Sequence, residues 1–176
     1  LYKDKKYIEF QKRLEVLVES DAKNIRVAAV SAFITHQLNQ QDLYPFCKKP
    51  LDFFHNGSLR NYTDNVNALV KNIILEAEQE RFLWEPNNTT TVSGFQTDNT
   101  IFQAGNNCMD LEKIIIKEIN NYRTKFTPDD CLFISSWPDN YILKGWYIRL
   151  MKNGYQKAHI HPDGWISGVI YLKTIE

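Results

Sequence analysis

The spacing of apolar residues changes near Pro128, and this change most constrains what the chain can fold into. Before Pro128, apolar residues recur at intervals of three and four, the period of an amphipathic helix. After Pro128 they alternate, with Trp146, Ile148 and Leu150 on one face of an extended segment. Helices followed by antiparallel strands are the order of an α+β protein, whereas a doubly wound sheet alternates the two. The sequence therefore predicts the α+β fold class.

Two amphipathic helices are expected at the start of the chain, over residues 3–19 and 25–38. Ser20 or Asp21 is the predicted N-cap of the second helix, because both side chains can accept hydrogen bonds from helical N–H groups. The pair and its tight connection resemble a hairpin from a helical-repeat array. A two-helix cap on a domain remains the alternative, since one pair defines no repeat period.

Two further helices are predicted at about 63–82 and 109–124, where apolar residues again follow the helical period. A turn-rich connector containing Pro45 and Pro50 precedes the first of them. The polar run 87–91 between the two helices is expected to be a loop. Helices therefore account for most of the chain before the change of period.

Three extended segments are predicted after that change. Residues 132–134 indicate a short strand, 142–151 a longer one, and the apolar, β-branched run 165–173 another. Asn153-Gly154 is a strong signal for a hairpin turn. Between this turn and the last strand lie the residues most able to carry chemistry.

His159 and His161 lie two positions apart between these strands, and Asp163 follows after another two. Side chains two positions apart on an extended backbone point to the same side, so the two imidazoles can reach one metal ion. Pro162 and Gly164 interrupt regular pairing, so Asp163 can already turn away from this direction. From spacing alone, metal binding and a pair of solvent-exposed polar histidines remain open alternatives.

Composition narrows the function classes. The chain has 21 Lys and Arg and 21 Asp and Glu, and this zero net charge argues against a nucleic-acid binder driven by electrostatics. Its three cysteines lack the CxxC spacing of a zinc ribbon and favour a reducing, cytoplasmic location. No apolar run reaches the roughly 18–20 residues of a membrane span. Neither nucleic acid nor a membrane is therefore an expected partner.

The residues around the histidines form a longer pattern. Residues 145–150 are Gly-Trp-Tyr-Ile-Arg-Leu, 153–156 are Asn-Gly-Tyr-Gln, and 159–162 are His-Ile-His-Pro. Residues 165–172, Trp-Ile-Ser-Gly-Val-Ile-Tyr-Leu, complete it. The pattern resembles a family of 2-oxoglutarate/iron(II) oxygenases that includes bacterial proteins with tetratricopeptide repeats before the oxygenase region, and marine phage proteins. The resemblance, weaker upstream, covers residues 83–176.

This resemblance implies a double-stranded β-helix, or jelly roll, that binds Fe(II) and 2-oxoglutarate and hydroxylates a substrate. Its motif places His159 as the first metal ligand, and His161 where related enzymes have the carboxylate of an HxD motif; both are candidate catalytic residues. Because His161-Pro162-Asp163 is itself an HxD motif, His159 with His161 is favoured, and His161 with Asp163 remains the rival ligand pair. A site of histidines with at most one carboxylate leaves positions on Fe(II) for the keto acid and oxygen.

Tyr147 and Arg149 share one face of the preceding strand, which makes them candidates to line the 2-oxoglutarate pocket. A cross-strand pair on an exposed face is the alternative role for both. The third metal ligand, a histidine, and the basic residue that anchors 2-oxoglutarate are expected beyond Glu176. The jelly roll is therefore expected to be truncated here, and the chain alone is not expected to be a competent enzyme.

Two regions are expected along the chain. Residues 1–57 form a helical region, and residues 58–176 form the N-terminal part of the oxygenase domain. A helical region beside an oxygenase favours protein recognition, so a protein side chain is the first hypothesis for the unknown substrate.

Two other interpretations remain open. A cupin-type metalloenzyme also uses HxH on a jelly roll, but it needs a glutamate shortly after the second histidine, where Trp165 and Ile166 stand. The other interpretation is non-enzymatic, with a helical adaptor followed by a β-sandwich binding module.

Overall fold

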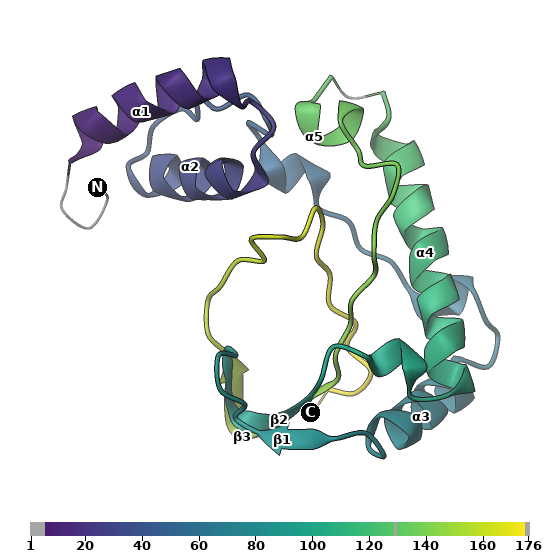
Figure 1. Ribbon diagram of the computed structural model, residues 1–176. Helices are drawn as coiled ribbons and strands as arrows, with labels where there is room; N and C mark the ends of the chain where they lie inside the picture. Colours follow the sequence, from purple (N-terminus) through teal and green to yellow (C-terminus); the bar gives the residue numbers. More distant parts are fainter. Residues whose placement is uncertain (1–5, 129, 175–176) are drawn as a thin grey trace. The chain divides into compact units, whose positions relative to one another are not determined.

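The computed structural model describes residues 6–128 and 130–174, and Figure 1 shows their helices and strands. These residues form helices and a three-stranded antiparallel sheet in the order β1-β2-β3, which confirms the predicted α+β class. Contacts divide the chain into two compact units, each built from separated stretches, so the units do not test the predicted division at residue 57. We call them the helical unit (residues 1–55, 122–139 and 160–167) and the sheet unit (residues 56–121, 140–159 and 168–176).

The helical unit begins with the two predicted helices. They are α1 (Tyr7–Ser20) and α2 (Ile25–Gln37), and in the described residues both lie close to their expected positions. A short 3-10 helix (Pro50–Phe53) and the single-turn α5 (Leu132–Ser135) complete its helices, together with the last turn of α4.

Asn24 caps α2, so the predicted caps Ser20 and Asp21 are wrong. The side-chain oxygen of Asn24 accepts hydrogen bonds from the backbone N–H groups of Arg26 (3.1 Å) and Val27 (3.2 Å). Ser20 is still part of α1, and the Asp21 carboxylate instead accepts a hydrogen bond from the Asn24 side-chain amide (2.9 Å). The two predicted caps therefore lie too early in the chain, and Asp21 acts by orienting the real one.

Tyr44 fixes the connection between α1 and α2. Its side chain is 1% exposed, and its hydroxyl accepts a hydrogen bond from the Asn24 N–H (3.0 Å) and donates one to the Asp21 carbonyl oxygen. Asp42 accepts from the Tyr44 N–H (2.9 Å) and from the Ser31 hydroxyl (2.6 Å). Burial raises the pKa of Tyr44, so the hydroxyl keeps the proton that it donates.

An aromatic cluster forms the core of the helical unit, with the Phe133 ring at its centre. Five other rings lie with their centroids 5.5 to 6.3 Å from that ring: Phe46, Phe53, Tyr122, Trp137 and Trp165. The predicted strand at 132–134 is wrong, because this segment forms α5. Phe133 and Ile134 are both buried, whereas a strand would point adjacent side chains to opposite faces.

The sheet unit holds the strands and the other two long helices. The helices are α3 (Val66–Ala77) and most of α4 (Asn106–Phe126), as predicted, with short 3-10 helices at Leu59–Asn61 and Ile101–Gln103. The strands are β1 (Phe82–Trp84), β2 (Thr91–Thr97) and β3 (Ile148–Gln156). β1 and β2 were not predicted; the predicted helix at 63–82 and loop at 87–91 reach only their first residues, Phe82 and Thr91. Three strands do not test the predicted jelly roll.

The core of the sheet unit lies between α3 and α4. Ile73 and Ala77 of α3 pack with Cys108 and Leu111 of α4 and with Ile101, and all five are at most 6% exposed. This is the apolar stripe that the helical periodicity predicted on both helices. Among residues 6–128 and 130–174, no helix is both long and apolar enough to cross a membrane.

Glu76 of α3 supplies the cap of α4. One carboxylate oxygen accepts from the Asn107 N–H (3.1 Å) and the Asn107 side-chain amide (2.6 Å), and the other accepts from the Cys108 N–H (2.9 Å). Gly105 precedes α4, and a Cβ there would lie 2.4 Å from the carboxyl carbon of Glu76. The chain therefore has no side chain at the usual capping position and uses an acidic residue from another helix.

The pairing of β2 with β3 shifts register in the middle. Val92 pairs with Tyr155 and Gly94 pairs with Leu150, so residues 151–154 bulge out opposite a single residue of β2. Such an insertion bends a strand and interrupts its row of pairing groups.

Asn153-Gly154 lies in this bulge, so the predicted hairpin turn is wrong. Asn153 has the left-handed φ of 64° that the Asn-Gly signal favours. A Cβ on Gly154 would lie 2.4 Å from the carbonyl oxygen of Ser93, which leaves room only for glycine. The backbone conformation at this position follows the sequence signal, but β3 continues beyond it.

Residues 165–173 form no strand, so that prediction is also wrong. Trp165 packs in the aromatic cluster of the helical unit, and Leu172 packs against the core of the sheet unit. These side-chain anchors hold the segment in place of backbone pairing.

Candidate metal centre

His159 lies just beyond β3 on a backbone tied to the start of β2. The Lys157 N–H donates to the Thr90 carbonyl oxygen (2.8 Å), and the Lys157 carbonyl oxygen contacts Nδ1 of His159 (2.7 Å). A carbonyl oxygen only accepts, so Nδ1 carries the hydrogen and Nε2 is the basic nitrogen of the neutral ring. Metal-binding histidines usually donate their other ring N–H to a backbone carbonyl or carboxylate in this way.

Polar side chains of β2 and the residue before it fix Gln156, which precedes this segment. The Thr90 hydroxyl donates to the Gln156 side-chain oxygen (2.6 Å), and the Gln156 amide donates to the Thr91 hydroxyl (2.6 Å). The Thr91 hydroxyl in turn donates to the Gln96 side-chain oxygen (2.7 Å). The sequence shows Thr90 and Thr91 in a polar run and Gln156 in the longer pattern, but it does not show that these side chains contact one another.

His161 begins a tight turn in the helical unit. The Gly164 N–H donates to the His161 carbonyl oxygen (3.1 Å), and the backbone turns at Pro162 and Asp163. The side chains of His161 and Asp163 are both exposed. The extended HxHxD register therefore does not continue through Asp163.

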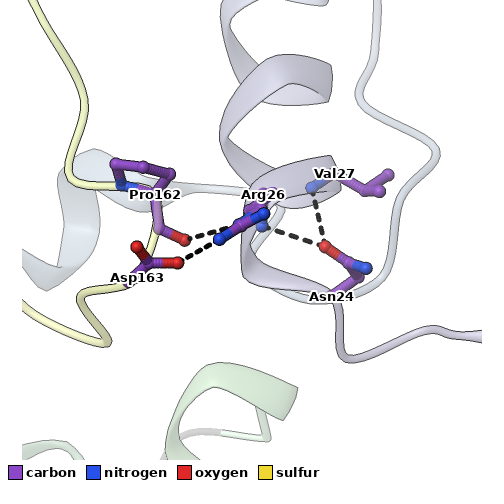
Figure 2. A network of polar contacts seen from close by, with 5 residues as sticks. All are labelled: Asn24, Arg26, Val27, Pro162 and Asp163. Carbon is purple, nitrogen blue, oxygen red and sulfur yellow. Dashed lines mark hydrogen bonds and ion pairs between the residues drawn. The ribbon is translucent and has the colours of Figure 1, made fainter.

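Arg26 of α2 contacts this turn at two points, as Figure 2 shows. Its Nε donates to the Pro162 carbonyl oxygen (3.3 Å), and its Nη2 forms an ion pair with Oδ1 of Asp163. Sequence analysis missed Arg26, because no sequence pattern connects a residue of the second helix with a motif near the other end of the chain.

Tyr147 and Arg149, the predicted 2-oxoglutarate residues, contact other side chains of the sheet unit. The Tyr147 ring stacks on Phe82, with centroids 5.6 Å apart, and burial raises the pKa of its hydroxyl. The Arg149 guanidinium lies 5.0 and 5.1 Å from the ring centroids of Phe82 and Phe95, and it pairs with Glu78 (2.8 Å). These contacts test neither role expected for the two residues, and binding of 2-oxoglutarate by either one remains a prediction.

The predicted ligands divide between the two units, with His159 in the sheet unit and His161 and Asp163 in the helical unit. In the part of the chain that the structure describes, no group of three or more His, Cys, Asp or Glu side chains is arranged to hold a metal ion. Imidazole nitrogens are nevertheless suitable ligands for Fe(II), and the hydrogen bond of His159 prepares Nε2 for that use. The chemistry of the two histidines therefore fits an iron site, whereas Oδ1 of Asp163 is already paired with Arg26.

Comparison with known families identifies this region. A family model described as "Putative 2OG-Fe(II) oxygenase" matches residues 144–176. The match confirms the resemblance to the 2-oxoglutarate/iron(II) oxygenases over this stretch, which contains Tyr147, Arg149, His159 and His161. No curated protein and no solved structure matches the chain significantly.

Proposed function

We propose that this protein is an Fe(II)- and 2-oxoglutarate-dependent dioxygenase that hydroxylates a substrate still to be identified. The observation that carries the proposal is the oxygenase family match over residues 144–176, which includes His159 and His161. The hydrogen bond from His159 to the Lys157 carbonyl supports it, because it presents Nε2 as the metal-binding nitrogen.

In this proposal His159 and His161 hold the iron, and the network around Gln156 keeps His159 in place. When bound, Fe(II) and 2-oxoglutarate would supply, with dioxygen as the oxidant, an oxidative decarboxylation that yields succinate and carbon dioxide and hydroxylates a C–H bond; one oxygen atom enters succinate and the other enters the substrate. Arg149 would bind a carboxylate of 2-oxoglutarate by exchanging its partner Glu78 for the keto acid, since guanidinium groups pair readily with carboxylates.

The finer fold is part of the same proposal. We propose that β1, β2 and β3 are strands of a double-stranded β-helix whose HxH motif follows β3. Their antiparallel pairing supports this assignment, as does the position of His159 directly after the strand. A cytoplasmic location is also proposed, supported by free thiols at Cys47, Cys108 and Cys131.

The proposed substrate is a protein side chain. Large apolar side chains on α1 and α2 are exposed, including Ile8 (73%), Val16 (65%) and Phe33 (56%), and such surfaces often contact other proteins. The test is to add cell extract, separated by ultrafiltration, to the protein at its natural full length and to measure succinate. Stimulation by the retained macromolecules supports the proposal, and stimulation by the small-molecule filtrate alone would refute it.

The activity itself is tested by incubating the full-length protein with Fe(II) and 2-oxoglutarate and measuring succinate. We expect iron-dependent succinate that falls to background in His159→Ala and His161→Ala. The matched control is His36→Ala, which removes an exposed histidine from the last turn of α2 and should leave turnover unchanged. Absence of iron-dependent succinate in the wild type would favour the non-enzymatic adaptor.

A further inference from the structure

Side chains of the helical unit contact the turn at residues 161–164 and the residue that follows it. Arg26 contacts the turn itself, through a backbone carbonyl and through a carboxylate. Immediately after the turn, the Trp165 ring packs edge-on against Phe46 (centroids 5.3 Å apart) and stacks against Phe133 (6.2 Å). A short exposed turn that carries a proposed metal ligand is thereby attached at two adjacent points.

The backbone position of Arg26 is itself fixed. Arg26 lies in the first turn of α2, and its N–H donates to the capping oxygen of Asn24. The side-chain amide of Asn24 donates to Asp21, which orients that oxygen. Figure 2 shows the resulting chain of contacts, from Asn24 through Arg26 to Pro162 and Asp163. The guanidinium therefore reaches the turn from a rigid helix end.

We propose that Asp163 is a positioning residue and not an iron ligand. Its ion pair with Arg26 fixes the turn that carries His161, a proposed ligand of the ion. This inference rests on the proposed function and chooses between the two ligand pairs that the sequence leaves open. It also assigns a role to α2, which the oxygenase resemblance does not include.

The contacts of Asp163 favour this choice. Arg26 bonds the Pro162 carbonyl through Nε and Asp163 through Nη2, so one planar group restrains both the main chain and the side chain of the turn. The guanidinium charge also offsets that of the carboxylate, which makes Asp163 a poorer ligand for a metal cation. Because the ion pair is exposed, with side-chain exposures of 64% and 79%, its removal should weaken metal binding without abolishing it.

The test uses cobalt(II) as the probe, added to the full chain and followed by its visible absorption. Arg26→Met and Asp163→Asn are each expected to weaken cobalt binding by about two- to five-fold, the range typical of an exposed ion pair. Because Arg26→Met already removes the partner of Asp163, the double variant should bind no more weakly than Arg26→Met alone. The cobalt spectrum should keep its shape in all three variants, since the ligands are unchanged.

The matched control is Arg13→Met. It removes an ion pair of comparable exposure, between Arg13 and Glu9 of α1, and should leave cobalt binding unchanged. The inference is overturned if Asp163→Asn changes the spectrum and weakens binding far more than Arg26→Met, as loss of a ligand would. Cobalt binding equal to wild type in Arg26→Met would overturn it as well.

A readout without metal separates this inference from the proposed function. The Gly164 amide, which donates to the His161 carbonyl, should exchange with solvent about two- to five-fold faster in Arg26→Met and Asp163→Asn than in the wild type. Unchanged exchange overturns the inference whether or not cobalt binds. If the wild type binds no cobalt but exchange still quickens, the proposed function fails while the anchoring of the turn is supported.

Discussion

Replacing Glu76 by alanine should destabilise the sheet unit, because this carboxylate caps α4 from a neighbouring helix. The substitution removes the acceptor for two backbone N–H groups, a loss that costs about 0.5–2 kcal/mol at helix N-termini. It also removes a negative charge from the positive end of the helix dipole, worth about 0.3–1 kcal/mol. The free energy of unfolding should therefore fall by about 1–3 kcal/mol.

The assay is urea unfolding followed by circular dichroism, combined with hydrogen exchange. The amides of Asn107 and Cys108, which lose their acceptor, should show the largest local increase in exchange rate. Glu15→Ala is the matched control, because it removes an exposed glutamate from α1 and should change stability by less than about 0.5 kcal/mol. A loss for Glu76→Ala no larger than that control would refute the capping argument.

The direction of the pKa shift of Glu76 predicts how its stabilising effect depends on pH. Burial raises the pKa of Glu76, but hydrogen bonds from the Asn107 side chain and from the Cys108 and Asn107 amides together lower it below its ordinary value of 4.5. A carboxylate with a lowered pKa stabilises the fold above its unfolded-state pKa, and this contribution disappears as the pH falls through the folded-state pKa. The stability difference between wild type and Glu76→Gln should therefore be full at neutral pH and shrink below about pH 4.5.

Three further outcomes follow from the packing. Cys108 is 0% exposed, and burial raises its pKa to about 12. Its thiol should therefore resist iodoacetamide at pH 8 and react only after unfolding. Rapid reaction of the folded protein would contradict this burial. Gly154→Ala should cost about 1–3 kcal/mol in urea unfolding because its Cβ would meet a β2 carbonyl oxygen, whereas Gly168→Ala, with nothing within 4 Å, should cost less. Tyr44→Phe should lower the melting temperature and the free energy of unfolding by about 1–2 kcal/mol, because the Asn24 N–H loses its nearer acceptor and the Asp21 carbonyl loses the hydroxyl donor; an unchanged melting temperature would argue against these hydrogen bonds.

The helices could be predicted closely, because each buries one apolar stripe of helical period. The extended segments could not be predicted as well. In the segment 132–134 two adjacent side chains enter one aromatic cluster, and in 165–173 side-chain anchors replace a strand. Asn153-Gly154 carries a correct signal about local backbone conformation, but the same conformation serves a bulge as well as a turn. An apolar run alone therefore shows neither pairing nor complete burial: Val169 (70%) and Tyr171 (77%) in the last segment are exposed.

The candidate site also combines residues that the sequence could predict with residues that it could not. His159 and His161 were found from spacing and family resemblance, since ligand type and motif are local in sequence. The role of Arg26 could not be predicted from the sequence, because its contact with Asp163 forms only when two segments distant in the chain come together. The stack of Tyr147 and Arg149 on Phe82 likewise depends on β1, a strand that the sequence did not indicate.

The bulge at residues 151–154 bears on how β3 could pair with a further strand. β3 lies at one edge of the described sheet, and it exposes Leu150 (37%), Met151 (47%) and Tyr155 (53%). A straight strand at an edge offers a continuous row of backbone donors and acceptors to a neighbouring strand. The inserted residues break this row into two short stretches, so a partner strand, from this protein or from another chain, could pair regularly with one stretch at a time.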